Sequence, residues 1–521
     1  MDTRKKVFLL ILFSAVVRCA VAYFLEFGND EVYYWTYAQH LQWNYFDHPP
    51  MVALLIRLGT FNLHLHNELF VRAGSIICAA INTWLVFLIG KKISDEKAGW
   101  CAALLYTSSF YCSIIAGTFI LPDSPQVLFW MISIFLMVEI IDEKNDNKNK
   151  SGVLLLMGIA IGLCIMSKVH GIFLWGGFGL YILLYNRKML AQPALYGAVL
   201  LTAIIVSPIL IWNIQNNFIT YSFHENRVGF FNKHLDWDSF LQQVLGSIAY
   251  NNPINFILYV IGITGIIKHK NFISNNYLRL FLLLGLPLII VLIIMSLFNE
   301  TLPHWSGPAY ISILLITSVY FSKKNLSAKI PRGILAANYL LLFVAIAGII
   351  VIRYLPIQLG NKKEKILGDG DVTLDMVGWR NFASEFYTLR NQDIKEGLMK
   401  KNSSIISDKW FPAANLDYYI ANPFDINFFA AGKIMDIHNY AWLNKKRKPL
   451  IKGDDAYFIF PSNYYNAPKD NLKNYFEKTD SASLIPQFRS NIHVRDFVMI
   501  RLHNYKGGLN DDGVINDEKS R

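Results

Sequence analysis

Long apolar runs constrain this chain more than any other feature. About eleven of them recur along the first two thirds of the sequence, each near the length that an α-helix needs to cross a bilayer. Inside lipid only a helix or a closed barrel satisfies its own backbone hydrogen bonds. The sequence therefore predicts a polytopic α-helical membrane protein whose spans lie near residues 7–25, 72–90, 99–117, 125–141, 153–167, 171–185, 194–212, 253–267, 280–298, 306–321 and 333–352.

The composition agrees with this assignment. The chain has 521 residues, of which 53% are hydrophobic and only 17% charged, and this is too apolar and too long for one soluble domain. The first run has no small-residue cleavage site, so we expect a membrane span and not a signal peptide. All five cysteines fall within apolar runs, which favours core residues over a disulfide framework.

The positive charges indicate an orientation. The formal net charge is +11, and most lysines and arginines of the membrane part gather in alternate loops. The positive-inside rule then puts the N-terminus in the cytoplasm, and an odd number of spans puts the C-terminal part outside. Because the charge follows the loops between spans, it does not indicate nucleic-acid binding, and we expect membrane lipids as the surroundings.

The composition changes after residue 355. A polar, glycine-containing linker, "NKKEKILGDGD", precedes short strand-like segments such as "SSIIS", "AYFIF" and "DFVMIRL", which alternate with helix-like segments. We therefore expect a membrane domain over 1–355 and a small extracytoplasmic α/β domain over 356–505. The polar residues 506–521 predict a disordered tail.

The segment after the first span is unusually rich in ionisable groups. "GNDEVYYWTYAQHLQWNYFDHPPM" contains Asp30, Glu31, Asp47 and His48, and such groups near hydrocarbon need a partner or a function. The acids could cap helices or pair with arginines. Two adjacent acids beside a span, with a third before a proline turn, favour general-base or metal chemistry.

Aromatic residues occupy one face of the same segment. Tyr33, Tyr34 and Trp43 suit a helix that lies at the membrane interface, and they could equally stack on a sugar. Pro49 and Pro50 favour an extended turn, which would fix the directions of the two residues before them.

Further polar residues stand at the predicted external ends of other spans. Asp123 lies in "LPDSP", where it could also cap the following helix. Lys168 in "SKVHG" runs against the positive-inside trend and requires an anion, and headgroup phosphates are the alternative. His224 and Arg227 lie in a long external loop, and His304 lies between Pro303 and a tryptophan. Together these residues predict one external site with carboxylates for proton transfer and cations for phosphate.

Two other classes of protein remain as alternatives. A transporter or lipid-linked sugar flippase would carry ionisable groups near the bilayer midplane, often in broken helices, and no chain of acids or broken helix is apparent in the spans. A scaffold whose external domain binds a partner would explain 356–505 but not the acidic segment. Both alternatives fit the sequence less well than an enzyme.

The motifs "NDEVYYWTYAQHLQWNYFDHPPM", "LPDSP", "MSKVHG", "LPHW" and "WFPAANLDYYIA" resemble the polyprenyl-phosphate-sugar-dependent glycosyltransferases of the GT-C superfamily. The nearest branch resembles bacterial protein O-mannosyltransferase-like and lipid A aminoarabinose transferase-like proteins. The resemblance implies a GT-C-like fold and inverting transfer of a sugar from a polyprenyl-phosphate donor, such as undecaprenyl phosphate. It implies a lipid, glycan or protein acceptor at the periplasmic face of the bacterial inner membrane, and no nucleotide.

The resemblance also assigns roles to particular residues. Asp30 of the Asp30-Glu31 pair matches the essential acid of the first external loop, and Asp123 matches the second acidic position. Asp47-His48 stands where the aminoarabinose branch has Glu-Lys, and Tyr33 stands where that branch has an arginine.

Because a neutral histidine is a poor phosphate clamp, other cations are needed near the carrier phosphate. Lys168, His224 and Arg227 are the candidates to bind it. No cofactor is certain. A divalent metal ion held by Asp47 and His224 is an open alternative under the same resemblance.

Overall fold

The computed structural model describes residues 2–142, 150–228, 234–268, 272–324, 330–464 and 472–515. They form two compact units. The helical unit comprises Met1–Ala22 with Leu41–Ala345, and the C-terminal unit comprises Tyr23–His40 with Ile346–Arg521. The sequence places the boundary near residue 355, whereas these units divide within a helix at 345 and assign residues 23–40 to the C-terminal unit.

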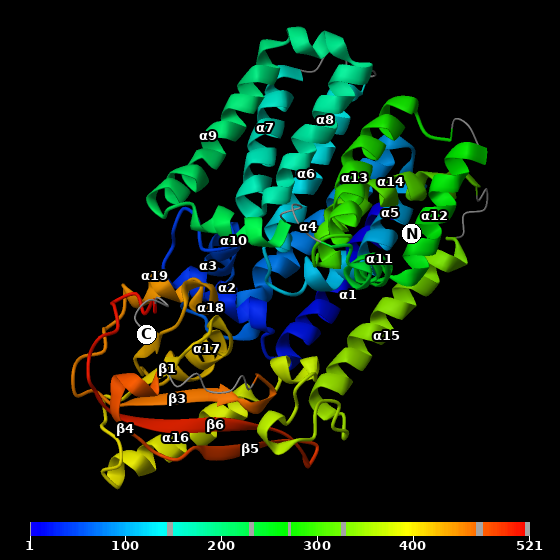
Figure 1. Ribbon diagram of the computed structural model, residues 1–521. Coiled ribbons are helices and arrows are strands. Elements are labelled where there is room, and N and C mark those ends of the chain that lie inside the picture. Colours follow the sequence, from blue (N-terminus) through cyan, green and yellow to red (C-terminus); the bar gives the residue numbers. More distant parts are fainter. Residues whose placement is uncertain are drawn as a thin grey trace. The chain divides into compact units, whose positions relative to one another are not determined.

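Each predicted apolar run is helical over most of its length (Figure 1). In chain order the helices that contain these runs are α1 (Thr3–Phe24), α4 (Glu68–Ile93), α5 (Glu96–Ser108), α6 (Asp123–Ile141), α7 (Lys150–Ser167), α8 (Ile172–Tyr185), α9 (Pro193–Gln215), α12 (Pro253–Lys268), α13 (Asn275–Ser296), α14 (Gly307–Lys324) and α15 (Arg332–Tyr354). The helices α3 (Met51–Gly59), α10 (Ile219–Val228) and α11 (Trp237–Tyr250) lie between them. The prediction of a polytopic helical fold is confirmed.

The predicted number of spans is not confirmed. In the part of the chain that the structure describes, seven helices are long and apolar enough to cross a membrane, namely α1, α4, α6, α7, α9, α13 and α15. An eighth span results if α11 and α12, which meet at a bend of 94°, count as one. That bend was not expected from the sequence. Residues of α5 are largely buried by neighbouring helices, and a helix covered by protein does not need a full lipid-facing length.

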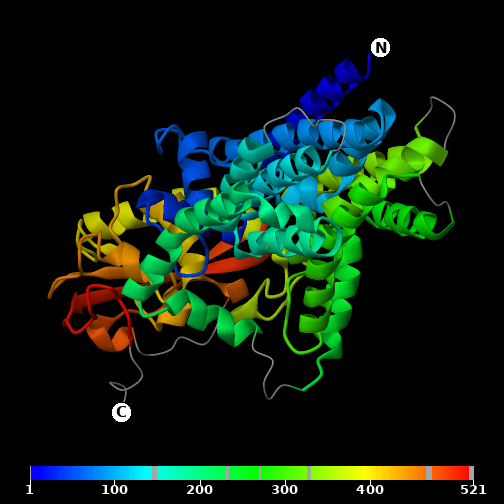
Figure 2. The ribbon, with the colours of Figure 1, turned by 90° about the horizontal axis from the view of Figure 1, so that it is seen from above.

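Small residues bring the long helices into close contact. The views in Figures 1 and 2 show α7 and α9 side by side, and a Cβ at Gly158 of α7 would overlap the backbone of Ala198 in α9. Gly90 of α4 meets Gly99 of α5 in the same way. Because lipid tails are as apolar as leucine, close packing at such small residues is a main force that holds membrane helices together.

The C-terminal unit is built on a six-stranded sheet with the order β2-β1-β3-β6-β4, with β5 also paired to β6. Its strands are β1 (Ser404–Ser407), β2 (Phe428–Ala430), β3 (Ala456–Pro461), β4 (Phe476–Thr479), β5 (Ser483–Arg489) and β6 (Ile492–Tyr505). The strand β1 pairs in parallel with β2 and β3, while β6 is antiparallel to its neighbours. Helices α2 (Asn29–Gln39), α16 (Trp379–Lys395), α17 (Trp410–Leu416), α18 (Ile434–Ile437) and α19 (Tyr440–Asn444) complete the unit. The predicted α/β domain is confirmed.

Successive side chains of β6 point to opposite faces of the sheet, and apolar side chains on both faces are buried. Val498, Ile500 and Leu502 belong to one apolar cluster. On the opposite face the ring of Phe497 stacks on Phe382 of α16 with centroids 3.8 Å apart, and Figure 1 shows α16 alongside the sheet.

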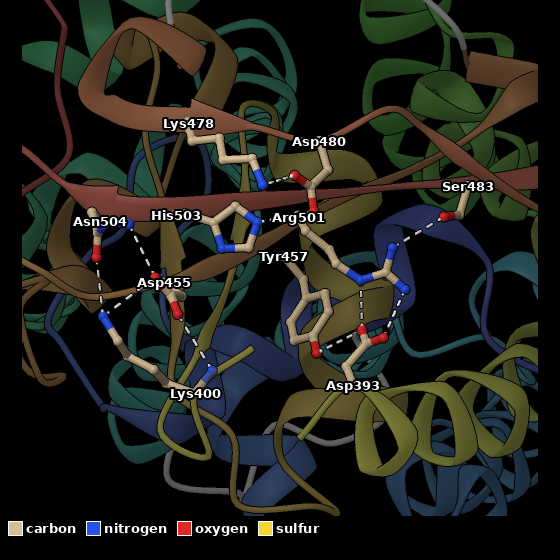
Figure 3. A network of polar contacts seen from close by, with 10 residues as sticks. All are labelled: Asp393, Lys400, Asp455, Tyr457, Lys478, Asp480, Ser483, Arg501, His503 and Asn504. Atoms are coloured by element: carbon tan, nitrogen blue, oxygen red, sulfur yellow. Dashed lines mark hydrogen bonds and ion pairs between the residues drawn. The ribbon is translucent and has the colours of Figure 1, made fainter. Parts of the chain in front are cut away.

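A polar network joins α16 to the sheet on this second face (Figure 3). Both carboxylate oxygens of Asp393 accept hydrogen bonds of 2.7 Å from the guanidinium of Arg501, and the Tyr457 hydroxyl donates a third at 3.0 Å. Asp393 is only 3% exposed. A second group, Asp480 with His503 and Lys478, lies nearer the surface of the same network.

The chain end is ordered as far as the structure describes it. Leu509 and Ile515 pack against the apolar cluster of the sheet, and Val514 forms a β-bridge with Gly432. The sequence predicts a disordered tail over 506–521, and residues 516–521 lie outside the described residues. The apolar side chains of Leu509 and Ile515, in a tail that is mostly polar, account for the packing.

We predict that Asp393→Ala destabilises the C-terminal unit. The change leaves the guanidinium of Arg501 without its carboxylate, and breaking a buried pair costs about 3–5 kcal/mol, which corresponds to roughly 10 °C in the unfolding midpoint of a unit of this size. Differential scanning fluorimetry in detergent would measure the shift. Asp480→Ala, which removes a partly exposed carboxylate, is the control and should shift the midpoint by less than a third as much. Equal shifts for both variants would contradict the prediction.

Candidate active site

Asp123 is the centre of a buried polar cluster in the helical unit. It is the first residue of α6, is 2% exposed, and accepts hydrogen bonds with both carboxylate oxygens. The Lys168 ammonium donates to Oδ2 at 2.8 Å, and the Tyr111 hydroxyl donates to Oδ1 at 2.9 Å. The sequence singled out Asp123 and Lys168 separately, and the structure brings them together as an ion pair.

Local backbone structure sets the directions of the Lys168 and Tyr111 side chains. Lys168 lies between α7 and a short 3-10 helix, Val169–Gly171, where the chain leaves the helix axis. Tyr111 opens a π-helical turn, Tyr111–Ile115, that follows α5. A Cβ at Gly307 would overlap the Tyr111 ring, so only glycine lets α14 begin this close to the tyrosine.

The contacts of these two residues bear on their alternative roles. Pro122 is the N-cap of α6, and the carboxylate of Asp123 in the first turn accepts hydrogen bonds from Lys168 and Tyr111. Lys168 is 3% exposed and does not extend toward lipid headgroups. Two charges buried together are stable only while each compensates the other, which explains why neither extends into solvent.

Histidines surround this ion pair. Burial, with the Lys168 ammonium second, lowers the pKa of His304 to about 4, although Asp123 opposes the shift. Desolvation, Lys168 and His224 lower the pKa of His48 well below its usual value. Both imidazoles are therefore neutral near pH 7, and each offers one donor and one acceptor nitrogen.

The turn before α3 is held by α10. The His224 ring nitrogen Nε2 lies 2.9 Å from the backbone oxygen of Asp47, and the rings of His48 and His224 have centroids 6.3 Å apart. The ring of Phe223 packs on Phe46 with centroids 4.8 Å apart. Arg227 belongs to α10, but its side chain lies outside the described residues. The structure thus brings Asp47, His48 and His224 together.

A metal ion held by Asp47 and His224 stays a prediction. In the structure the His224 ring contacts the backbone oxygen of Asp47. Across the ranges that the structure describes, no group of three or more histidine, cysteine or acidic side chains is arranged to hold a metal ion.

The remaining candidate residues lie on α2 in the C-terminal unit. Asp30 is exposed in the first turn, whereas Glu31 is buried and its Oε2 accepts the Gly28 backbone N–H at 3.1 Å, which caps the helix. Tyr33 is buried, its ring lies 5.0 Å from the ring of Trp410, and its hydroxyl accepts the backbone N–H of Asn439 at 3.3 Å.

The ring of Tyr34 lies 5.7 Å from that of Tyr33. Both tyrosines are therefore buried parts of an aromatic core, and their contact with a sugar stays a prediction.

Sequence reasoning missed Tyr111 and His170. Tyr111 lies twelve residues before its partner Asp123, within an apolar run and without a local motif. His170 interacts electrostatically with His48 and stands in the quoted "SKVHG". Only its position two residues after Lys168 could have indicated a role.

Residues 47–212 match the family described as dolichyl-phosphate-mannose-protein mannosyltransferase. The chain is 22% identical over 400 residues to lipid A galacturonosyltransferase RgtD of Rhizobium johnstonii, which covers 76% of this chain and 79% of that protein.

Solved structures share the fold. The crystal structure of ArnT from Cupriavidus metallidurans bound to undecaprenyl phosphate aligns with a TM-score of 0.62 at 13% identity, over 96% of this chain and 98% of that one. Arabinofuranosyltransferase AftD from Mycobacteria aligns with a TM-score of 0.54 at 10% identity, over 97% of this chain and 40% of that one. The chain is a multi-pass membrane protein of the glycosyltransferase class. Its sequence and fold resemble those of GT-C glycosyltransferases, as the sequence motifs predicted.

We predict that His304 makes the helical unit less stable in acid. Its folded pKa of about 4 lies below the value of about 6.5 for an unfolded histidine, so the unfolded state binds more protons between these values. Stability should fall by roughly 2 kcal/mol as the pH drops from 6.5 to 4. Unfolding midpoints measured against pH for wild type and His304→Gln would test this.

The variant should lose that part of the slope, and His66→Gln, at an exposed histidine, should keep it. Identical slopes in wild type and His304→Gln would contradict the assignment.

Proposed function

We propose that this protein is an inverting glycosyltransferase that moves a sugar from a polyprenyl-phosphate donor, undecaprenyl phosphate in particular, to a lipid, glycan or protein acceptor. Transfer takes place at the periplasmic face of the bacterial inner membrane, with the N-terminus in the cytoplasm. The observation that carries the proposal is the buried ammonium of Lys168, held at a helix end by Asp123 and flanked by neutral histidines. This is an environment that suits a phosphate ester reached from the lipid.

The donor assignment rests on the chemistry of Lys168. An ammonium has three N–H donors, and Asp123 takes one of them. The others can bind oxygens of the carrier phosphate, whose charge grows as it leaves the sugar. A preorganised cation in a water-poor site stabilises such charge far better than it does in water. The shared fold with ArnT, crystallised with undecaprenyl phosphate, supports the same donor.

Asp30 is the proposed general base. The acceptor hydroxyl attacks the anomeric carbon from the face opposite the phosphate, Asp30 takes the hydroxyl proton, and polyprenyl phosphate leaves. The anomeric carbon gains oxocarbenium character on the way, as in glycoside cleavage. Of the two adjacent acids, Asp30 is the exposed one, while Glu31 caps the helix. Glu31 thereby supports the base.

The other residues have supporting roles in this mechanism. Asp123 holds Lys168 in place through the ion pair between them. The neutral rings of His48 and His304 can donate to sugar or phosphate oxygens. Asp47 and His224 shape the turn that carries His48.

The acceptor we favour is lipid A. The relative RgtD is a lipid A galacturonosyltransferase that spans most of this chain, and a membrane-embedded acceptor would reach the outer ends of the helices without leaving the bilayer. A periplasmic protein is the second choice because the matched family is described as acting on protein.

We predict that Asp30→Asn reduces sugar transfer about 10²- to 10⁴-fold, because an amide cannot take the acceptor proton. A deletion strain would be complemented with wild type, Asp30→Asn or Asp238→Asn, and its lipid A and membrane glycoproteins compared by mass spectrometry. Asp238 is an exposed acid in the first turn of α11, and its variant should restore the modification fully. Near-normal turnover of Asp30→Asn in membranes would rule out the base assignment.

We predict that Lys168→Met lowers transfer at least about 100-fold through loss of phosphate stabilisation. The single change also leaves Asp123 buried without its cation, so the double variant Lys168→Met/Asp123→Leu serves as the structural control. The double variant should recover the unfolding midpoint but not the activity. Recovery of both stability and transfer would show that Lys168 is only structural.

A further inference from the structure

The first turn of α2 is held by side chains that arrive from the far end of the sequence. The Asn29 amide donates to Asp375 Oδ2 at 3.0 Å and to the Tyr464 hydroxyl at 3.2 Å. Tyr464 in turn donates to Asp375 Oδ1 at 2.9 Å. These three residues, which we name the Asn29 clamp, form a closed triangle of hydrogen bonds within the C-terminal unit.

The residues just before the clamp are fixed as well. The two carboxylate oxygens of Glu26 accept the backbone N–H groups of Trp379 and Arg380 at 2.8 and 3.3 Å, which caps the first turn of α16. The backbone N–H of Phe27 donates to the Tyr419 hydroxyl at 2.8 Å. The chain that enters α2 therefore has little freedom of its own.

We propose that Asp375 is a positioning residue for sugar transfer, because with Tyr464 it holds Asn29 and so sets the place and direction of Asp30. Asp30 follows Asn29 directly in the same helical turn, so a shift of the clamp moves the carboxylate. This inference rests on the proposed role of Asp30. A misplacement of about 1 Å can cost as much as 100-fold in rate, so a clamp at this point is consequential.

A buried arginine acts electrostatically on Asp375. Arg495 of β6 donates to the backbone oxygens of Leu374 and Val377, at 2.8 and 2.7 Å. Its guanidinium lies 4.9 Å from the Trp379 ring centroid and 4.7 Å from that of Phe497. The cation is therefore engaged with the segment that carries Asp375.

Two further charged groups complete the surroundings of Asp375. Asp371 is paired with Arg489 at 3.1 Å, and Glu26 interacts electrostatically with Arg495. Burial raises the pKa of Asp375 to about 6, against the opposing effects of Tyr464 and Arg495.

Rate and stability should respond to pH in opposite directions. Above pH 6 Asp375 is ionised and accepts both hydrogen bonds, and below pH 6 its proton turns one acceptor oxygen into a donor. The transfer rate should therefore fall as the pH drops through 6. The folded pKa lies above the unfolded value, so the folded state binds more protons than the unfolded state between pH 4 and 6. The free energy of unfolding therefore increases as the pH drops from 6 to 4. If Asp375 had only a structural role, the transfer rate would not fall while the stability increases.

The experiment compares Asp375→Asn with Asp480→Asn, a matched change at a partly exposed carboxylate of the same unit. Asp375→Asn should transfer sugar about tenfold more slowly at pH 7.5, lose the fall in rate below pH 6, and keep or raise its unfolding midpoint. Asp480→Asn should keep the wild-type rate profile. A wild-type rate and profile for Asp375→Asn would overturn the proposal, as would a loss of rate that matches a loss of stability.

Two further measurements separate the clamp from the role of Asp30. If Asn29 and Asp375 act together, the double variant Asn29→Ala/Asp375→Ala should be no slower than the slower single variant. Amide hydrogen exchange in residues 29–34 of the purified full-length protein should speed up about fivefold or more in Asp375→Asn, whether or not Asp30 is the base. Unchanged exchange would overturn the clamp, whereas faster exchange with an active Asp30→Asn variant would overturn only the proposed function.

Discussion

Charge compensation in a water-poor interior is the constraint on which the helical unit depends. Asp123 and Lys168 are buried together, and neither charge would be stable there alone. Their opposite charges leave the ion pair near neutrality. The surrounding imidazoles remain uncharged because burial, and after it the Lys168 ammonium, lowers the pKa of His48 and His304. The pair explains why the turn after α7, the start of α6 and the π-helical turn at Tyr111 converge at one point.

Much of the fold could be predicted from sequence because hydrophobic length and alternation are local properties. Each apolar run is helical over most of its length, and the strand-like segments of 404–407 and 456–461 are strands. The expected count of eleven spans is not confirmed, because the hydropathy of a run does not distinguish lipid contact from protein contact. The helix α5 is buried by its neighbours, and Pro253 stands at the bend between α11 and α12, but a proline there is equally typical of the first residue of a separate helix.

The candidate site was predictable only residue by residue. Asp123 and Lys168 stood out because each was unusual for its place in a membrane protein, yet nothing local indicated that they are partners across 45 positions. The contacts of α2 were even harder to predict from the sequence, because Asn29 binds Asp375 and Tyr464 at separations of 346 and 435 residues. A single sequence reveals which groups need a partner, but pairing at such separations is a property of the packed chain.

The C-terminal unit includes residues 23–40, and this has a consequence for biosynthesis. The helix α2 leaves the ribosome early, but the carboxylate that binds its first residue follows 346 residues later. At ordinary translation speeds of about 5–20 residues per second, that interval is roughly 20 to 70 s. During this time the aromatic side chains of α2 lack the residues that bury them in the folded unit. Membrane insertion and release from the ribosome must therefore proceed while an apolar helix is still exposed.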